Sequence, residues 1–314
     1  NYRFFNVTPQ AQINFMPKAQ FNIGINYRGN TVQPNISQLQ PLRDNTDPLN
    51  EYKGNPDLKV GFNHQTSVYI NQYKVLSQQW LGLSFSYTVQ QNAITQFNTV
   101  DETTGKRTYY PVNVNGNRNW FLWANFNKSK GNGKPNYGFG LNGNGSRFNN
   151  FVNGQKALTQ SFTFSANLDL GISKEDKFDF SLSPRIGYNS SKSSLNNAID
   201  NNYFSYGGNF NAEVTLPWKL EVYTNLNADL RQRIQAFASN VNLVVWNAGI
   251  SKKIFKKDTG KISFSANDLL DDNKGFTRNI SNTFVSDDRY QRISRYFLLR
   301  FEWSFNQSPG TQPK

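Results

Sequence analysis

Long segments in which apolar residues alternate with polar or small ones recur along the whole chain. In residues 219–231, alternate positions from Leu220 to Leu230 are apolar or Thr, and the intervening positions from Glu221 to Arg231 are polar or charged. Because successive side chains of a β-strand point to opposite faces, such a segment has one apolar and one hydrated face. About ten residues of tilted strand cross a bilayer. The pattern predicts an all-β, transmembrane, antiparallel up-and-down β-barrel.

About thirteen such strands are expected, and their connections alternate in length. Short turns on one side and long loops on the other are typical of outer-membrane barrels, in which the short turns are periplasmic. We expect long loops at residues 29–58, 91–119, 149–156, 190–202, 232–240 and 271–290. The predicted strands are 3–15, 19–28, 59–74, 79–90, about 119–126, 137–145, about 162–170, 178–188, 203–216, 220–231, 241–254, 261–270 and 292–305.

The composition of the chain favours a barrel over other membrane and soluble folds. The mean hydropathy is only -0.67, although 15% of the 314 residues are aromatic. A barrel accommodates this combination because only alternate strand residues meet lipid. No apolar run is long enough for a transmembrane helix. A soluble β-sandwich or propeller is the alternative, but such proteins use strands nearer five or six residues. We therefore expect a location in the bacterial outer membrane.

Charge and residue usage argue against nucleic-acid binding and against catalysis. The 34 Lys and Arg against 21 Asp and Glu give a net charge of +13, but no basic run is concentrated enough for nucleic acid. A solvated surface, outer-membrane lipid or lipopolysaccharide, or an anionic cargo explains the cations. The chain has no Cys and one His, His64, which lies on an apolar rail. We expect no enzyme activity, no cofactor and no metal site, since the cluster Asp268, Asp271 and Asp272 matches no calcium loop.

The segment from Leu39 to Lys59, LQPLRDNTDPLNEYKGNPDLK, carries the most specific motif in the chain. It resembles a signature of the TonB-dependent receptor-like outer-membrane barrel family of Bacteroidota, in which Q-L-Q-P, D-N-x-D-P-L and G-N-P-x-L-K-P precede a barrel strand. Val60 stands where the family often has Pro. The resemblance implies a barrel of about 22 strands with an N-terminal plug and a TonB box, of which this chain would be the C-terminal part.

The ends of the chain fit that interpretation. No export signal opens the sequence, and an odd strand number conflicts with the even number of bacterial barrels, so we expect at least one strand before Asn1. Residues 1–305 are expected to form the barrel part, and residues 306–314 a polar tail.

Three functions follow as hypotheses. The first is a TonB-dependent-receptor-like transporter that takes up a scarce solute. The second is a structural or accessory barrel subunit of a larger outer-membrane complex, without transport of its own. The third is a passive porin-like channel. The partners implied are a plug domain and TonB outside this sequence, or a surface lipoprotein or other outer-membrane subunits.

Candidate site residues follow from the motif and from the alternation. Substrate or loop contact is predicted for Gly54, Asn55, Pro56 and Asp57. Lumen-facing positions are predicted at Asp169, Asp179, Arg185, Glu213, Glu221, Arg231, Arg300 and Glu302. Lipid-facing positions are predicted at Phe164, Leu226, Trp246, Phe301 and Trp303.

Overall fold

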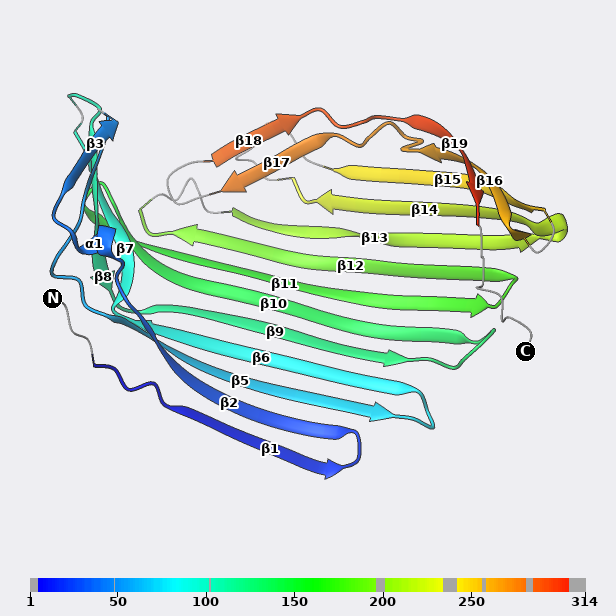
Figure 1. The fold of residues 1–314 in the computed structure, drawn as a ribbon, viewed down its shortest axis with the longest axis horizontal. Coiled ribbons are helices and arrows are strands. Elements are labelled where there is room, and N and C mark those ends of the chain that lie inside the picture. The colour runs from blue at the N-terminus through cyan, green and yellow to red at the C-terminus, as the bar shows by residue number, and fades with distance from the viewer. Residues whose placement is uncertain are drawn as a thin grey trace, which may run out of the picture.

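The computed structural model describes residues 5–47, 49–101, 103–195, 201–233, 242–255, 258–280 and 285–304. Thirteen strands form one continuous sheet, and every neighbouring pair is antiparallel (Figure 1). In spatial order the strands are β1 Gln10–Lys18, β2 Phe21–Val32, β5 Gly61–Lys74, β6 Gln79–Gln91, β9 Asn117–Lys128, β10 Pro135–Val152, β11 Gln155–Lys174, β12 Phe178–Ser193, β13 Asn201–Leu216, β14 Leu220–Arg231, β15 Leu243–Ile254, β16 Gly260–Asn267 and β19 Tyr296–Trp303.

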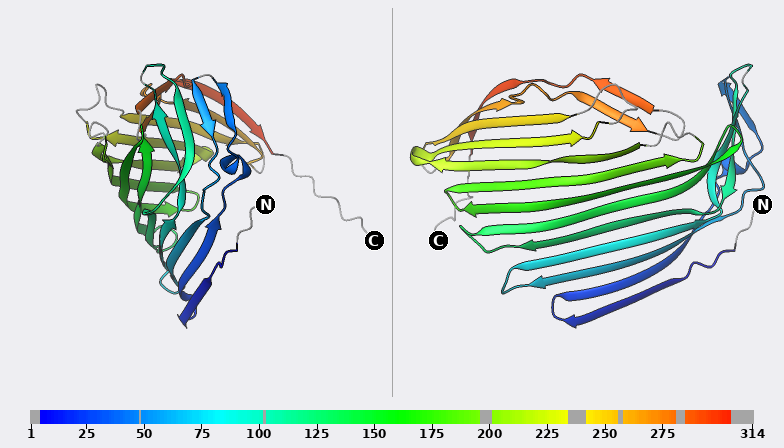
Figure 2. Two further views of the ribbon diagram at one scale, coloured as in Figure 1. Left: turned by 90° about the vertical axis from the view of Figure 1, so that its left-hand side faces the viewer. Right: turned by 180° about the vertical axis from the view of Figure 1, so that it is seen from behind.

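This sheet is the predicted array of thirteen antiparallel strands, and it curls into a trough (Figure 2). Strands β1 and β19 form its two edges, and no pairing joins them among the described residues. Within the same residues, no helix is long and apolar enough to cross a membrane. The predicted tail, residues 306–314, lies outside the described part of the chain.

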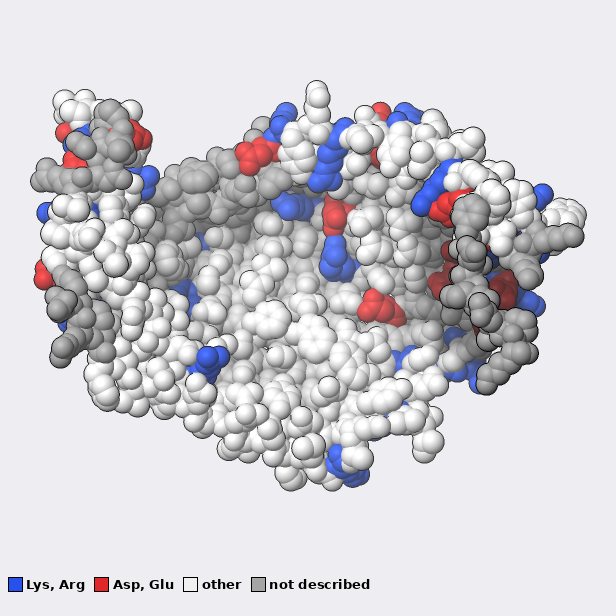
Figure 3. Space-filling model, viewed as in Figure 1, with Lys and Arg blue, Asp and Glu red and all other residues white. Residues whose placement is uncertain are grey.

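The two faces of the sheet differ in polarity because the strand registers align residues of one kind. Phe210, Leu226 and Trp246 lie in one cross-strand row. The acidic residues of the thirteen strands all fall on the opposite face, at Asp169, Asp179, Glu213, Glu221, Asp229 and Glu302. Figure 3 shows acidic and basic side chains inside the hollow of the trough. The polar face is therefore concave and the apolar face convex.

Many side chains of the apolar face stay exposed in the described part of the chain. Phe164 is 38% exposed, Trp246 39%, Phe301 57% and Trp303 55%. The buried hydrophobic residues are only Leu39, Leu58, Val114, Ala157 and Ala266 among those described. An apolar surface of this extent is not left in water by a soluble protein, so it requires hydrocarbon as its solvent.

Short connections gather at one end of the trough, as predicted (Figure 1), with the exception of the turn between β10 and β11, which lies at the other end. The first of them differs in position from the turn at residues 16–18 that the predicted strands 3–15 and 19–28 imply. Strand β1 continues through Pro17 to Lys18, and the turn is Ala19–Gln20, where Gln20 has a φ of 62°. Pro17 is tolerated because β1 is an edge strand and its register shifts between Phe15 and Lys18.

The prediction of a long loop at residues 149–156 is wrong. Strands β10 and β11 are longer than predicted, and they pair as far as Val152 and Gln155. Their connection is Asn153–Gly154, with φ values of 48° and 77°. Both residues have the left-handed backbone that Asn-Gly supplies in a two-residue hairpin turn.

Two other expected loops contain a second sheet, here called the cap sheet. Its strands are β3 Arg43–Asp47, β4 Asn50–Lys53, β7 Ala93–Val100 and β8 Arg107–Val114, in the order β3-β4-β8-β7. A short helix, α1 Ile36–Leu39, precedes β3. The cap sheet stands at the end of the trough opposite the short turns (Figures 1 and 2). The expected loop at residues 271–290 likewise holds a hairpin, β17 Gly275–Ile280 and β18 Val285–Tyr290.

Replacing Leu226 with Arg tests the facing of the strands. Leu226 is on the convex face near the middle of β14, so Leu226→Arg places a charge in hydrocarbon and lowers the free energy of unfolding by about 2 to 4 kcal/mol. Asn225→Arg, one position away on the concave face, is the matched control and has a small effect. Urea titrations in lipid vesicles measure both, and equal tolerance of the two substitutions would contradict the assignment.

Candidate functional site: the inner wall and the cap sheet

The concave face is divided into a neutral half and a charged half. From β1 to β10 its only charged residue is Arg28, near the cap end of β2, and Asn, Gln, Ser, Gly and aromatic residues make up the rest. From β11 to β19 the same face carries the predicted lumen residues and further lysines. The concave face thus presents two chemically different surfaces.

Aromatic rings and amides form the neutral half. The indoles of Trp80 and Trp123 lie 5.5 Å apart between ring centroids. The Trp80 Nε1 donates to Asn71 Oδ1 at 3.0 Å. Tyr69 lies across Gly24, and its hydroxyl donates to Asn14 Oδ1 at 2.7 Å. Rings that stack, beside amides that donate and accept, suit an uncharged polar solute.

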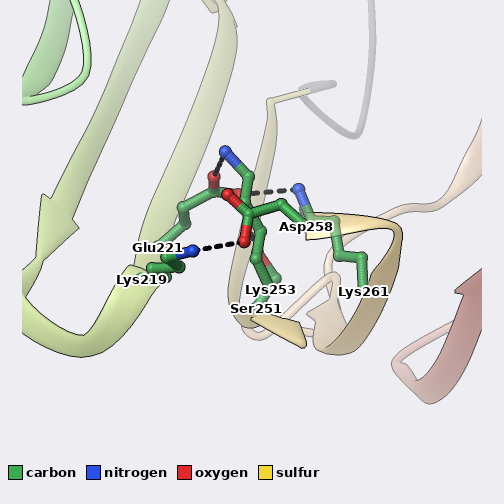
Figure 4. A network of polar contacts seen from close by, with 6 residues as sticks. All are labelled: Lys219, Glu221, Ser251, Lys253, Asp258 and Lys261. Atoms are coloured by element: carbon green, nitrogen blue, oxygen red, sulfur yellow. Dashed lines mark hydrogen bonds and ion pairs between the residues drawn. The ribbon is translucent and has the colours of Figure 1, made fainter. Parts of the chain in front are cut away.

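The charged half is organised around Glu221 at the short-turn end (Figure 4). One carboxylate oxygen of Glu221 pairs with Lys253 Nζ at 2.8 Å, and the other accepts from Lys261 Nζ at 2.7 Å and from Ser251 Oγ at 3.0 Å. Glu221 is only 7% exposed. Nearby, Lys219 pairs with Asp258 at 2.5 Å. Three donors on one carboxylate join β14, β15 and β16 into a rigid wall.

The other predicted lumen residues also lie on the concave face, and most have a partner there. Arg185 reaches across Gly207, which has no side chain, to pair with Asp229 at 2.5 Å. The remaining contacts are Arg300 with Glu302 at 2.6 Å, Arg231 over the Tyr203 ring at 5.5 Å, and Asn167 donating to Asp169 at 2.7 Å.

Asp179 and Glu213 are directly opposite each other on β12 and β13. They line a pocket of about 600 Å³ at the short-turn end, together with Glu221 and Lys253. The alternation predicted the positions of these side chains but not their pairing. Their exposure to a water-filled lumen stays a prediction.

The cap sheet is held by asparagine side chains. Asn113 Oδ1 accepts from Lys59 N at 2.7 Å, and its Nδ2 donates to the carbonyl oxygens of Lys59 at 3.0 Å and Asn92 at 2.7 Å. One amide therefore ties together both of the connections that build the cap sheet. A salt bridge of 2.5 Å between Lys106 and the buried Glu51 supports the parallel pair of β4 and β8.

A second contact fastens the cap sheet to the main sheet. The Asn153 Oδ1 accepts from Val100 N at 3.0 Å, and the Asn98 Oδ1 accepts from Asn153 N at 3.0 Å. Phe97 packs on Phe151 of β10, with ring centroids 4.9 Å apart. The turn between β10 and β11 is thus the anchor of the cap.

The predicted contact segment, residues 54–57, is built into the cap. Gly54 is buried against backbone, so no larger side chain fits there. The Asn55 backbone N donates to Gln38 O at 2.6 Å, and its Nδ2 donates to Pro111 O at 2.9 Å. These two hydrogen bonds join Asn55 to both connections of the cap, so Asn55 has a structural role. Contact with a solute stays a prediction for the segment, whose exposed residues are Pro56 and Asp57.

The acidic cluster after β16 closes a turn. The Asp268 carboxylate accepts from the backbone N of Asp272 at 3.1 Å and of Asn273 at 3.0 Å. Asp272 in turn accepts from Val244 N at 3.1 Å and from Lys274 Nζ at 2.8 Å. Among the described residues, no three His, Cys, Asp or Glu side chains are grouped to hold a metal ion.

Several of these residues were not singled out from the sequence. The lysines at 253 and 261 and the asparagines at 98, 113 and 153 gain their roles through partners distant in the chain. The alternation in AITQFNTV and RTYYPVNV, and the Asn-Gly pair at 153–154, were the local signals for β7, β8 and the turn.

A continuous antiparallel sheet with an apolar outer face and a polar inner face defines an outer-membrane β-barrel protein. A model of the "Outer membrane protein beta-barrel family" matches residues 1–185 and 141–303. The chain belongs to this family, and it resides in the bacterial outer membrane. A search of curated proteins found no match.

Removing the Asn113 amide should loosen the cap. Asn113→Ala leaves the backbone groups of Lys59 and Asn92 without partners, so the local stability falls by about 1 to 3 kcal/mol. Hydrogen exchange of the amides in β7 and β8 measures the loss. Asn144→Ala, on the exposed concave part of β10, should leave that exchange unchanged, and unchanged exchange in Asn113→Ala as well would refute the role of Asn113.

Acid should release the turn between β16 and β17. The hydrogen bond from Lys274 lowers the pKa of Asp272, and the bond from Val244 N adds to this effect. Because the folded pKa is below the unfolded value, the stabilisation is full above about pH 4 and is lost as the pH falls through the folded pKa. Exchange of the Val244 amide should accelerate in that window, and in Asp272→Asn this pH dependence should be absent.

Proposed function

We propose that this chain forms part of the wall and mouth of an energised outer-membrane transporter for a scarce, uncharged polar solute. The observation that carries the proposal is the division of the concave face. Its neutral half offers a pair of neighbouring indoles, tilted to each other by 50°, and amide groups, and its charged half is cross-linked within the wall by Glu221 and its two lysines.

The cap sheet supports the same proposal. Two long connections form an ordered sheet at the outer end of the trough, held by Asn113 and Asn153. Ordered loops at the mouth can shape a binding site, as substrate-binding loops do in many folds. The motif in residues 39–59 adds the resemblance to TonB-dependent receptors of Bacteroidota. Under this proposal the partners are a plug domain, TonB and a surface lipoprotein.

Solute uptake by cells with and without the full-length protein tests the function. A panel of radiolabelled uncharged polar solutes is offered with and without a protonophore, because TonB-dependent transport needs the proton-motive force. We expect at least one solute whose uptake requires both the protein and the proton-motive force. Uptake that persists with the protonophore would indicate a porin-like channel, and no difference between the strains would favour a structural subunit.

The neutral wall can be tested in the same assay. Removing both indoles with Trp80→Ala and Trp123→Ala should lower uptake at limiting solute by at least about fivefold, since stacking contributes roughly 0.5 to 1.5 kcal/mol per ring. Trp218→Ala is the matched control, because Trp218 is exposed in a short turn, Pro217–Lys219. Equal uptake by all variants would contradict a role of the Trp80 and Trp123 rings in solute uptake.

A further inference from the structure

Three cations lie in one row on the convex face at the cap end of the sheet. Arg118 of β9 is directly opposite Arg147 of β10, and the row continues through Gln160 of β11 to Lys192 of β12. The register around this row is continuous, so these side chains share a face with the apolar residues of the same strands. Arg118, for example, has the parity of Leu122 and Phe126.

A groove of about 620 Å³ runs beside this row. Its lining combines the three cations with aromatic side chains of the neighbouring rows, Tyr87, Trp120, Phe162 and Tyr188. Gly145 lies between Trp120 and Phe162 in its row, and the Trp120 indole lies across it, so this ring forms part of the groove wall. The groove is therefore basic toward the cap and aromatic toward the middle of the membrane.

Within the described part of the chain, no acidic side chain pairs with this row. Like charges directly opposite each other destabilise a sheet, and the acidic residues of the thirteen strands are all on the concave face. Among the described residues, none of Arg118, Arg147 and Lys192 makes an ion pair, and the buried Arg147 Nε has no hydrogen-bond partner. An anion from outside the chain would satisfy all three.

The height of the row matches the headgroups of the outer leaflet. On the convex face of β9, Arg118 and Lys128 enclose the apolar positions Trp120, Leu122, Ala124 and Phe126. At about 3.3 Å per residue and a tilt of about 40°, the two cations are about 25 Å apart along the membrane normal, the height of the apolar band of such barrels. Lys128 is at the short-turn, periplasmic end, so Arg118 is at the outer interface.

We propose that Arg118, Arg147 and Lys192 bind the headgroup of a phosphorylated glycolipid of the outer leaflet. A phosphate between the two arginines accepts from both guanidinium groups, whose geometry suits phosphate oxygens. Lys192 lies two strands beyond Arg147, about 10 Å away, where a second phosphate of the same headgroup fits. An acyl chain then lies along Trp120 and Phe162 below.

Binding of lipid A to the full-length protein in phosphatidylcholine nanodiscs tests the proposal. Native mass spectrometry follows the titration with diphosphoryl lipid A, with its dephosphorylated form, and with competing inorganic phosphate. The variant Arg118→Gln/Arg147→Gln should bind diphosphoryl lipid A at least about tenfold more weakly than the wild type, since two charge-assisted contacts are lost. Lys128→Gln is the matched control, on the same face of β9, and should bind as the wild type does.

A stability readout separates a binding defect from misfolding. In phosphatidylcholine alone, the double variant should have a urea midpoint equal to or above that of the wild type, because a like-charge pair has been removed. Added diphosphoryl lipid A should raise the midpoint of the wild type only. Equal binding by the double variant, equal binding of the dephosphorylated lipid, or full displacement by millimolar inorganic phosphate would overturn the proposal.

Discussion

The structure depends on pairing every strand with a neighbour while its two faces meet different solvents. Hydrocarbon offers no partner to a backbone N–H or C=O, so only a laterally continuous sheet can stand in a membrane. Thirteen antiparallel strands provide that continuity. The same arrangement assigns each side chain to lipid or to the interior, which is why acidic residues are confined to the concave face and cations on the convex face lie near strand ends.

The concave face shows how such a wall becomes stiff without a hydrophobic core. Large side chains lie across glycines of the neighbouring strand, as Tyr69 does over Gly24 and Tyr223 over Gly249. Arg185 crosses Gly207 to reach Asp229 on the next strand but one. At Gly24 and Gly207 the missing side chain gives space for a contact that spans three strands, from Tyr69 to Asn14 and from Arg185 to Asp229. Polar networks of this kind resist deformation when all members are satisfied, and a fixed wall can hold rings and amides in place for a solute.

The membrane boundaries also organise the sites. The cap sheet stands beyond the outer interface, where water is present. The connections that build it contain the buried residues Leu39, Leu58 and Val114, and asparagine side chains add hydrogen bonds between them. Just below it, the row from Arg118 to Lys192 occupies the headgroup level, and the aromatic side chains occupy the level of the acyl chains. The Glu221 cluster lies at the opposite end, beside the short turns. The proposed solute site at the mouth, the proposed lipid site and the stiff Glu221 wall are thus separated by depth.

The sequence by itself determined the thirteen strands and the polarity of their faces, because a period of two residues is a local property that each segment carries alone. Segments such as residues 219–231 show it without any partner. Only the tertiary structure decided which side chains meet. The cap sheet pairs Asn50 with Arg107, the Glu221 cluster joins three strands, and Arg118 faces Arg147 through a register that one residue of slip would abolish. Such contacts depend on distances along the chain that local alternation does not encode.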